Sequence, residues 1–164
     1  MYQPGRHFLQ VPGATGVPAR VLRAIAAPTI DHRGTEFADL TREVLAGLQR
    51  IFKTSGPVVI FPSSGSGGWE AALVNTLSPG DKVLSFENGE FAAAWAEVAR
   101  RMGFDVEVMG GDWSRGVLPD AIEARLREDA DHAIKAILIV HNETSTGVTS
   151  RLPAIRQAID RARH

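Results

Sequence analysis

An alternation of short apolar runs and helix-like segments occupies the chain from Val58 to Arg163, and it constrains the fold most strongly. The apolar runs have the length of buried strands, and the segments between them have the spacing of helices. Strands that alternate with helices form a mainly parallel sheet, so we expect an α/β fold. The runs that predict strands are Val58–Phe61, Lys82–Phe86, Phe104–Met109 and Ala136–Val140, and the segments that predict helices are Trp69–Leu77, Phe91–Met102, Pro119–Glu128 and Pro153–Arg163.

Two segments precede this alternation. Residues 1–34 are rich in glycine and proline, which predicts an extended arm with a short helix near Pro18–Ala26. Apolar residues then recur every three or four positions from Phe37 to Ile51, which predicts an amphipathic helix that ends before Gly56. We therefore expect an arm over residues 1–34 and an α/β domain over residues 35–164.

The composition excludes several classes of function. Lysine and arginine number 18 against 19 aspartates and glutamates, and no basic block stands out, so neither nucleic acid nor a membrane is an expected partner. The absence of cysteine excludes disulfides, thiolate metal sites and cysteine nucleophiles in this chain. The five histidines lack metal-ligand spacing, and no long apolar run suggests a signal or membrane segment, so we expect a cytoplasmic protein.

Three polar or glycine-rich loops follow predicted strands. They are Pro62–Gly68, Glu87–Glu90 and His141–Ser150. Ligands of open parallel sheets lie at the carboxyl ends of the strands. The three loops are therefore the candidate site.

The loop "PSSGSGG" has the features of an anion site. Its glycines let backbone N–H groups converge, and the following helix directs its positive end to the same point. Ser63, Ser64 and Ser66 add hydroxyl donors. The alternative is an ordinary turn whose serine caps a helix.

Two familiar nucleotide patterns fit this loop poorly. No lysine follows the glycines, so the P-loop pattern fails. Gly65 and Gly67 match the dinucleotide pattern, but Glu70 replaces its third glycine. Glu87 stands where a ribose-binding acid would, so a nicotinamide-binding domain stays open as an alternative.

The other two loops carry an aromatic and a polar cluster. Phe91 begins a predicted helix, where its face could stack on a flat ring or could pack in the core. The polar run from His141 to Thr146 could donate hydrogen bonds to a ligand, or it could be a plain surface loop.

The stretches "SSGSGGWEAALVNTLSPGDKVL", "NGEF" and "HNETSTGVTS", with the opening "PGRHFLQVPGATGVPARVL", together resemble the class V aminotransferases. The similarity covers the whole chain and is greatest to the serine–glyoxylate and alanine–glyoxylate enzymes, which use pyridoxal 5′-phosphate. It implies the large domain of a fold type I pyridoxal-phosphate transferase, incomplete in this chain. The site residues that it implies are Ser64, Gly65 and Ser66 around the cofactor phosphate, Phe91 stacked on the pyridine ring, and Thr144 near the ring hydroxyl, with Asn142 and Glu143 close by.

The same resemblance implies that a lysine outside the matched motifs forms the Schiff base with the cofactor. Lys82 and Lys135 lie at the amino ends of predicted strands, about 15 Å from the carboxyl edge, and Lys53 follows a helix on the same wrong side. We therefore expect no catalytic residue here. The expectation is the N-terminal part of an enzyme that needs a missing C-terminal segment or a second chain.

The family's sheet has the strand order 3-2-4-5-6-7-1, which would separate Val58–Phe61 from the other strands of this chain. Unpaired strand groups are costly, so we expect stability only with a complementary segment or by self-association. The complete enzyme would transfer an amino group from serine or alanine to glyoxylate as a homodimer, with the N-terminal arm near Pro12–Gly16 lining the substrate side. A truncated, non-catalytic interaction or dimerisation module is the alternative outside enzymes.

Overall fold

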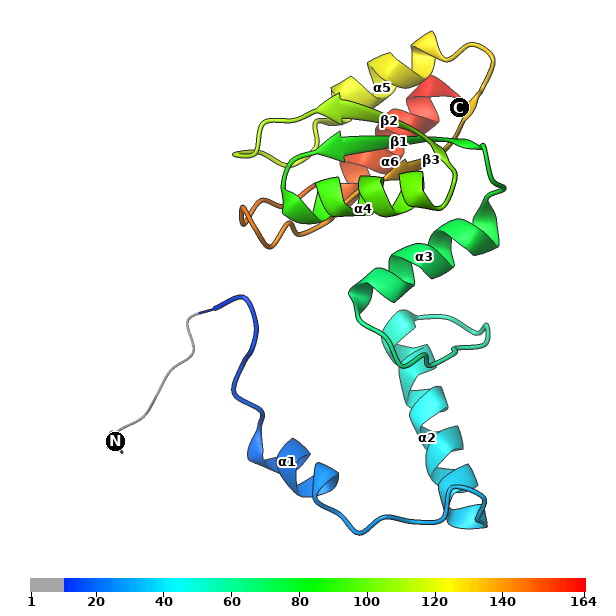
Figure 1. Cartoon of the computed structure of the whole chain (residues 1–164), viewed down its shortest axis with the longest axis vertical. Coiled ribbons are helices and arrows are strands. Elements are labelled where there is room, and N and C mark those ends of the chain that lie inside the picture. Colours follow the sequence, from blue (N-terminus) through cyan, green and yellow to red (C-terminus); the bar gives the residue numbers. More distant parts are fainter. Residues whose placement is uncertain (1–10) are drawn as a thin grey trace, which may run out of the picture. The chain divides into compact units, whose positions relative to one another are not determined.

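The computed structural model describes residues 11–164, and the chain divides into two compact units, Met1–Pro62 and Ser63–His164. The first unit contains α1 (Ala19–Ile25) and α2 (Thr35–Phe52), which confirms both helices predicted before the alternation (Figure 1). Helix α2 ends at Lys53, which adopts the left-handed conformation with φ 51°. The domain boundary after residue 34 stays a prediction.

The predicted strand Val58–Phe61 is wrong, because these residues form no regular element. Val59, Ile60 and Phe61 are 66%, 59% and 72% exposed. A strand exists only where a neighbour pairs with its backbone groups, and none of the described residues 11–164 pairs with this segment. We expected Val58–Phe61 to be a strand separated from the others, and the structure shows that without a pairing neighbour these residues form no strand.

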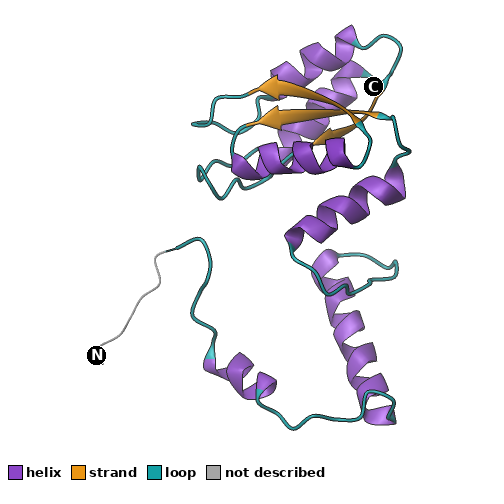
Figure 2. Ribbon diagram, viewed as in Figure 1, coloured by secondary structure: helices purple, strands orange, loops and turns teal. Residues whose placement is uncertain are grey.

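The second unit is built on a three-stranded parallel sheet in the order β2-β1-β3 (Figure 2). Strand β1 lies in the centre and is buried on both faces, as its continuous apolar run predicts. The parallel α/β fold is confirmed, and the strand order agrees with the 3-2-4 portion of the family's sheet. The strands are β1 (Lys82–Glu87), β2 (Asp105–Gly110) and β3 (Ile134–Leu138).

Four helices cover the two faces of this sheet. Helices α5 and α6 pack together on one face around Leu84, and α4 packs on the other with α3 beside it (Figure 1). Helix α3 begins four residues before the predicted start and β3 two residues before its own, whereas the other elements start within one residue of prediction. The helices are α3 (Gly65–Thr76), α4 (Glu90–Arg101), α5 (Pro119–Glu128) and α6 (Leu152–Ala162).

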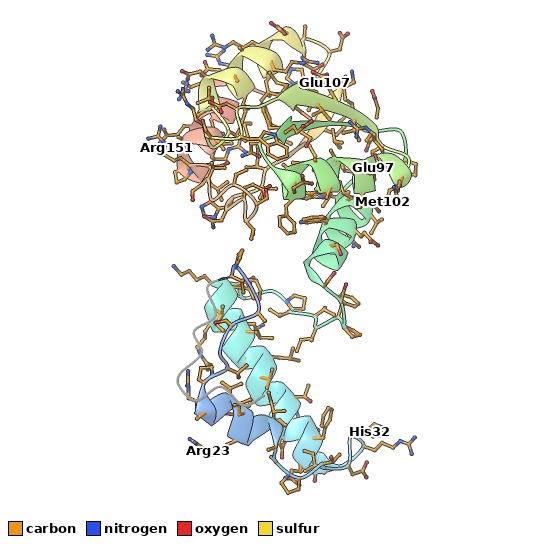
Figure 3. All side chains as sticks on the ribbon, turned by 60° about the vertical axis from the view of Figure 1, so that its left-hand side comes forward. Arg23, His32, Glu97, Met102, Glu107 and Arg151 are labelled. Atoms are coloured by element: carbon orange, nitrogen blue, oxygen red, sulfur yellow. The ribbon has the colours of Figure 1, made fainter. Side chains whose placement is uncertain are left out.

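Alternate residues of β1 pack into two hydrophobic cores, one on each face of the sheet. Leu84 and Phe86 pack with Ile122 of α5 and Ile155 of α6. Val83 packs on the opposite face with residues of α3 and α4. An ion pair adds a link at the edge strand, where Arg125 Nη2 of α5 donates to Glu107 Oε2 of β2 at 2.7 Å. Figure 3 labels Glu107 on this strand. These contacts hold the carboxyl ends of the strands in fixed positions.

Asp129 holds the turn before β3 and makes stability pH-dependent. Its Oδ2 accepts hydrogen bonds from Ile134 N and His164 Nε2, both at 2.8 Å. The Ile134 N–H, followed by the His164 side chain, lowers the pKa of Asp129 from 3.8 to about 2. The folded state therefore holds this proton less tightly than the unfolded chain, so the stabilisation is complete above about pH 4 and disappears as the pH falls toward about 2.

An Asp129→Asn variant tests this role. We expect its free energy of unfolding, measured by urea denaturation, to fall less between about pH 5 and pH 2 than that of the unmodified chain. An equal fall in the two proteins would contradict this role of Asp129.

Within residues 11–164, no helix has the length and apolar character needed to cross a membrane. The same residues contain no group of three histidine or acidic side chains placed to share a metal ion.

Candidate functional site

Two of the three predicted loops meet at the carboxyl edge of the sheet. Ser145 Oγ, in the loop after β3, accepts a hydrogen bond from Glu90 N at 3.0 Å. Thr146 Oγ1 donates to Asn88 O at 3.4 Å, so the loop after β3 also touches the loop after β1. The prediction that the polar loops share one edge is confirmed for these two. It is wrong for Pro62–Gly68 as a loop that follows a strand, because Val58–Phe61 forms no strand.

A buried carboxylate joins the two loops. Glu143 is 1% exposed, and its side chain accepts hydrogen bonds from Ala92 N at 3.0 Å, Ser145 N at 3.1 Å and Ser145 Oγ at 2.8 Å. Burial raises the pKa of Glu143, but the hydrogen bonds from Ser145, Ala92 and Phe91 outweigh it and hold the pKa below 4.5. The carboxylate is therefore ionised at neutral pH and lies at the positive end of α4, where a negative charge is stabilising.

Gly89 is required by this arrangement. A Cβ at this position would lie 2.2 Å from Glu143 Cγ and 2.4 Å from Glu143 Cδ. Glycine thus allows the start of α4 to approach the loop after β3 closely. The hydrogen bonds of Glu143 also fix the backbone next to Phe91, the aromatic that the sequence singled out.

The serine-rich turn forms the start of α3. Ser64 is the residue before the helix and makes no side-chain cap to it, and its Oγ lies 2.7 Å from Ser66 Oγ. Gly67 packs so closely that a Cβ would lie 2.1 Å from Ser63 Oγ. The first-turn N–H groups are therefore left without a serine cap, and two hydroxyls gather beside them. The capped-turn alternative does not describe this helix start.

Aromatic residues connect this turn to α4. Trp69, in α3, contacts Phe91 edge to face, with ring centroids 6.3 Å apart and planes at 72°. Trp69 also stacks on Trp95 at 5.6 Å. Phe91 is 44% exposed, so it is not a core residue and part of its ring can receive a ligand. Trp69 was not predicted as a site residue, although an aromatic near the start of the helix that follows a candidate anion loop is a usable signal.

Thr144 lies in the same loop as Glu143 and is exposed, while its neighbour is buried. The loop is closed by an isolated bridge between Asn142 and Thr149, and Thr149 Oγ1 donates to Asn142 Oδ1 at 3.0 Å. Thr144 is thus held on a fixed loop beside the start of α4. The structure links Thr144 to Phe91 through Glu143, and Phe91 to the serine turn through Trp69.

The two lysines of the second unit lie at the opposite edge. Lys82 is the first residue of β1, with its Nζ 3.7 Å from Asp105 Oδ2. Lys135 lies near the start of β3, and its Nζ donates to His132 O at 2.7 Å. Neither amine is near the carboxyl edge, because the strands separate them from it.

Comparison with known proteins identifies the family. The sequence profile of the class-V aminotransferases matches residues 8–163. Serine–glyoxylate aminotransferase of Methylorubrum extorquens is 47% identical over 163 residues, which cover 99% of this chain and 40% of that protein. The Arabidopsis thaliana serine–glyoxylate aminotransferase is 44% identical, over 100% of this chain and 41% of that protein. The chain therefore spans about 40% of the length of these curated relatives.

Solved structures agree with the sequence matches. An aspartate aminotransferase of subgroup IV from Thermus thermophilus superposes with a TM-score of 0.84 and 28% identity, over 95% of this chain and 43% of that one. Ureidoglycine–glyoxylate aminotransferase from Bacillus subtilis superposes with a TM-score of 0.80 and 29% identity, over 99% of this chain and 41% of that one. The resemblance read from the three loop motifs is confirmed. This chain belongs to the class-V aminotransferase family.

Proposed function

We propose that this chain supplies two parts of the cofactor site of a pyridoxal-phosphate-dependent aminotransferase. The serine turn at the start of α3 would bind the cofactor phosphate (the phosphate cradle), and the ring of Phe91 would stack on the cofactor ring (the ring platform). The observation that carries the proposal is the uncapped start of α3, with the paired hydroxyls of Ser64 and Ser66, joined through Trp69 to the exposed ring of Phe91. These features lie in one compact unit. They fit a flat aromatic cofactor that carries a phosphate.

The donor chemistry fits the phosphate. A phosphate dianion needs several N–H or O–H donors and favours the positive end of a helix. The backbone of Gly65 and Ser66 and the hydroxyls of Ser64 and Ser66 would supply these donors. Gly67, which packs against Ser63, fixes the turn that presents them. Since the helix start has no side-chain cap, no capping side chain would have to be displaced from its N–H groups.

The remaining predicted residues would orient the ring. Phe91 would stack on the pyridine, and Thr144 would hydrogen-bond the ring-hydroxyl region. Glu143 would act as a positioning residue, because it fixes both the backbone of α4 next to Phe91 and the loop of Thr144. The bound cofactor supplies an electron sink for reaction at the amino-acid α-carbon.

We also propose that the chain works with the part of the enzyme that it does not span. The family resemblance implies that the lysine that holds the cofactor would come from that part, and Lys82 and Lys135 lie at the opposite edge of the sheet from the candidate site. Serine or alanine would be the amino donor and glyoxylate the acceptor, by similarity to the serine–glyoxylate and alanine–glyoxylate relatives. A homodimer, which the family resemblance implies, and a cytoplasmic location are part of this proposal. The family match argues against the nicotinamide-binding alternative.

Phe91 variants test the ring platform. We expect Phe91→Ala to weaken binding of 4-deoxypyridoxine 5′-phosphate about 3- to 10-fold, because an aromatic contact contributes about 0.5–1.5 kcal/mol. Phe91→Trp should retain affinity, since the stacking face is kept. The analogue lacks the aldehyde, so no lysine can capture it covalently. Titration of tryptophan fluorescence measures the affinity, and equal affinities of Phe91→Ala and the unmodified chain would reject the stacking role.

A further inference from the structure

Phe91 has a fixed backbone but an exposed side chain. Hydrogen bonds to the Glu143 carboxylate hold the backbone N–H groups of Phe91 and Ala92 at the start of α4. These bonds do not fix the side-chain torsions of Phe91, and its ring is 44% exposed. A ring that changes rotamer must be ordered again whenever a ligand stacks on it, and this ordering weakens binding. A second contact that holds the ring itself would therefore raise the affinity of the ring platform.

Trp69 of α3 makes such a contact. Its ring centroid lies 6.3 Å from that of Phe91, and the two planes meet at 72°, which is the edge-to-face geometry that aromatic pairs favour. Among the rings of residues 11–164, only that of Trp69 makes an aromatic contact with Phe91. The contact restricts the tilt of the Phe91 ring and leaves part of its surface open to a ligand.

Trp69 is itself held against α4. It stacks on Trp95, with ring centroids 5.6 Å apart and planes at 15°. Phe91 and Trp95 are four residues apart in α4, so they lie on one face of that helix, and Trp69 contacts both. Trp95 in turn packs against the hydrophobic core that contains Val83 of β1. A continuous set of packed rings therefore connects this core to Phe91.

We propose that Trp69 is a positioning residue that holds the Phe91 ring in the orientation that stacks on the cofactor ring. The inference rests on the proposed function, because it requires Phe91 to be the ring platform. Trp69 lies in the helix that begins at the serine turn, five residues after Ser64. It therefore also fixes the Phe91 ring relative to the phosphate cradle. A ligand that carries both a phosphate and a ring would then meet both parts already arranged, which lowers the cost of binding.

Two substitutions of Trp69 test this role. We expect Trp69→Leu to weaken binding of 4-deoxypyridoxine 5′-phosphate to the full chain about 3- to 10-fold, because the Phe91 ring must then be ordered on binding. Trp69→Phe keeps a ring beside Phe91 and should bind within about 2-fold of the unmodified chain. Isothermal titration calorimetry measures these affinities, since both substitutions remove a tryptophan from the fluorescence signal. Equal affinities of Trp69→Leu and Trp69→Phe would overturn the proposal.

The matched control is Trp113→Leu. Trp113 is an exposed tryptophan in the loop after β2 and is assigned to no part of the cofactor site. Its replacement should leave the affinity for 4-deoxypyridoxine 5′-phosphate unchanged. A loss equal to that of Trp69→Leu would overturn the proposal, because the effect would then follow from the loss of any tryptophan.

Two further measurements separate positioning from damage to α3. Inorganic phosphate carries no ring, so its affinity, measured by competition with the analogue, should be the same in Trp69→Leu and in the unmodified chain. In a double-mutant cycle, Trp69→Leu should weaken binding by less than about 2-fold once Phe91→Ala has removed the ring. A lower affinity for inorganic phosphate in Trp69→Leu, or full additivity of the two substitutions, would overturn the proposal.

The outcomes distinguish this inference from the proposed function. If Phe91→Ala weakens binding and Trp69→Leu does not, the positioning role is overturned while the ring platform stands. If the analogue does not bind, or if neither substitution changes its affinity, both are overturned. Should Trp69→Leu fail to fold, Trp69→Met decides in its place, since methionine fills irregular space without a ring. Unchanged affinity in that variant would overturn the positioning role.

Discussion

Replacing Glu143 with leucine will lower the free energy of unfolding by about 3–5 kcal/mol, because each buried donor left without an acceptor costs about 1–3 kcal/mol. The donors affected are the buried N–H group of Ala92 and the part-buried N–H and hydroxyl groups of Ser145, of which the Ala92 group carries the largest cost. The variant also loses the negative charge at the start of α4. Urea unfolding followed by circular dichroism measures the change.

Two variants separate this role from a general effect of mutation. Glu143→Gln keeps the shape and one acceptor, so we expect a smaller loss of about 1–2 kcal/mol. Glu90→Leu is the matched control, since Glu90 is an exposed glutamate in the first turn of the same helix. Its effect should stay within about 0.5 kcal/mol. Equal free energies of unfolding of Glu143→Leu and Glu90→Leu would contradict this role of Glu143.

A carboxylate placed in the serine turn will abolish phosphate binding. We expect Ser66→Asp to weaken binding of 4-deoxypyridoxine 5′-phosphate at least about 100-fold, because like charges in contact cost several kcal/mol. The hydroxyl of Ser66 lies 2.7 Å from that of Ser64 at the start of α3, so the new charge would occupy the expected position of the phosphate. Ser66→Ala removes only one neutral donor and should weaken binding about 3- to 10-fold. Fluorescence titration of Trp69 and Trp95 gives both affinities.

The control for this prediction, Ser63, lies in the turn that precedes the same helix. Ser63→Ala removes a hydroxyl from the same turn that is not assigned to the phosphate, so affinity for the analogue should change little. Binding by Ser66→Asp that matches the unmodified chain would place the phosphate elsewhere. Loss of affinity for non-phosphorylated 4-deoxypyridoxine in the same variant would instead point to a damaged fold.

Much of the fold could be predicted because each central element depends on its own sequence. Strand β1 is a continuous apolar run that is buried on both faces, and α5 begins at a proline, where the fixed φ favours a helix start. Val58–Phe61 has an equally apolar sequence but no partner strand among the described residues. A strand depends on its neighbour as well as on its own residues, and periodicity carries no information about that neighbour.

The site was predictable in outline for a similar reason. Chain order places the loops after β1 and β3 at one edge, so their meeting follows from the parallel sheet. The link through Glu143 was not predictable, because it joins residues 51 positions apart and follows no local spacing. Gly89 likewise looks like any loop glycine until its distance from Glu143 is known. Asn88 reads as a polar turn residue, and only the structure shows that its amide is buried.

The most direct test of the central claim compares two ligands that differ only in the phosphate. The full chain should bind 4-deoxypyridoxine 5′-phosphate at least about 100-fold more tightly than 4-deoxypyridoxine, because charge-assisted bonds at the start of α3 hold the phosphate. Quenching of tryptophan fluorescence should accompany binding, since Trp69 contacts Phe91. Equal affinities for the two ligands would contradict the claim that this turn is the phosphate cradle of an aminotransferase.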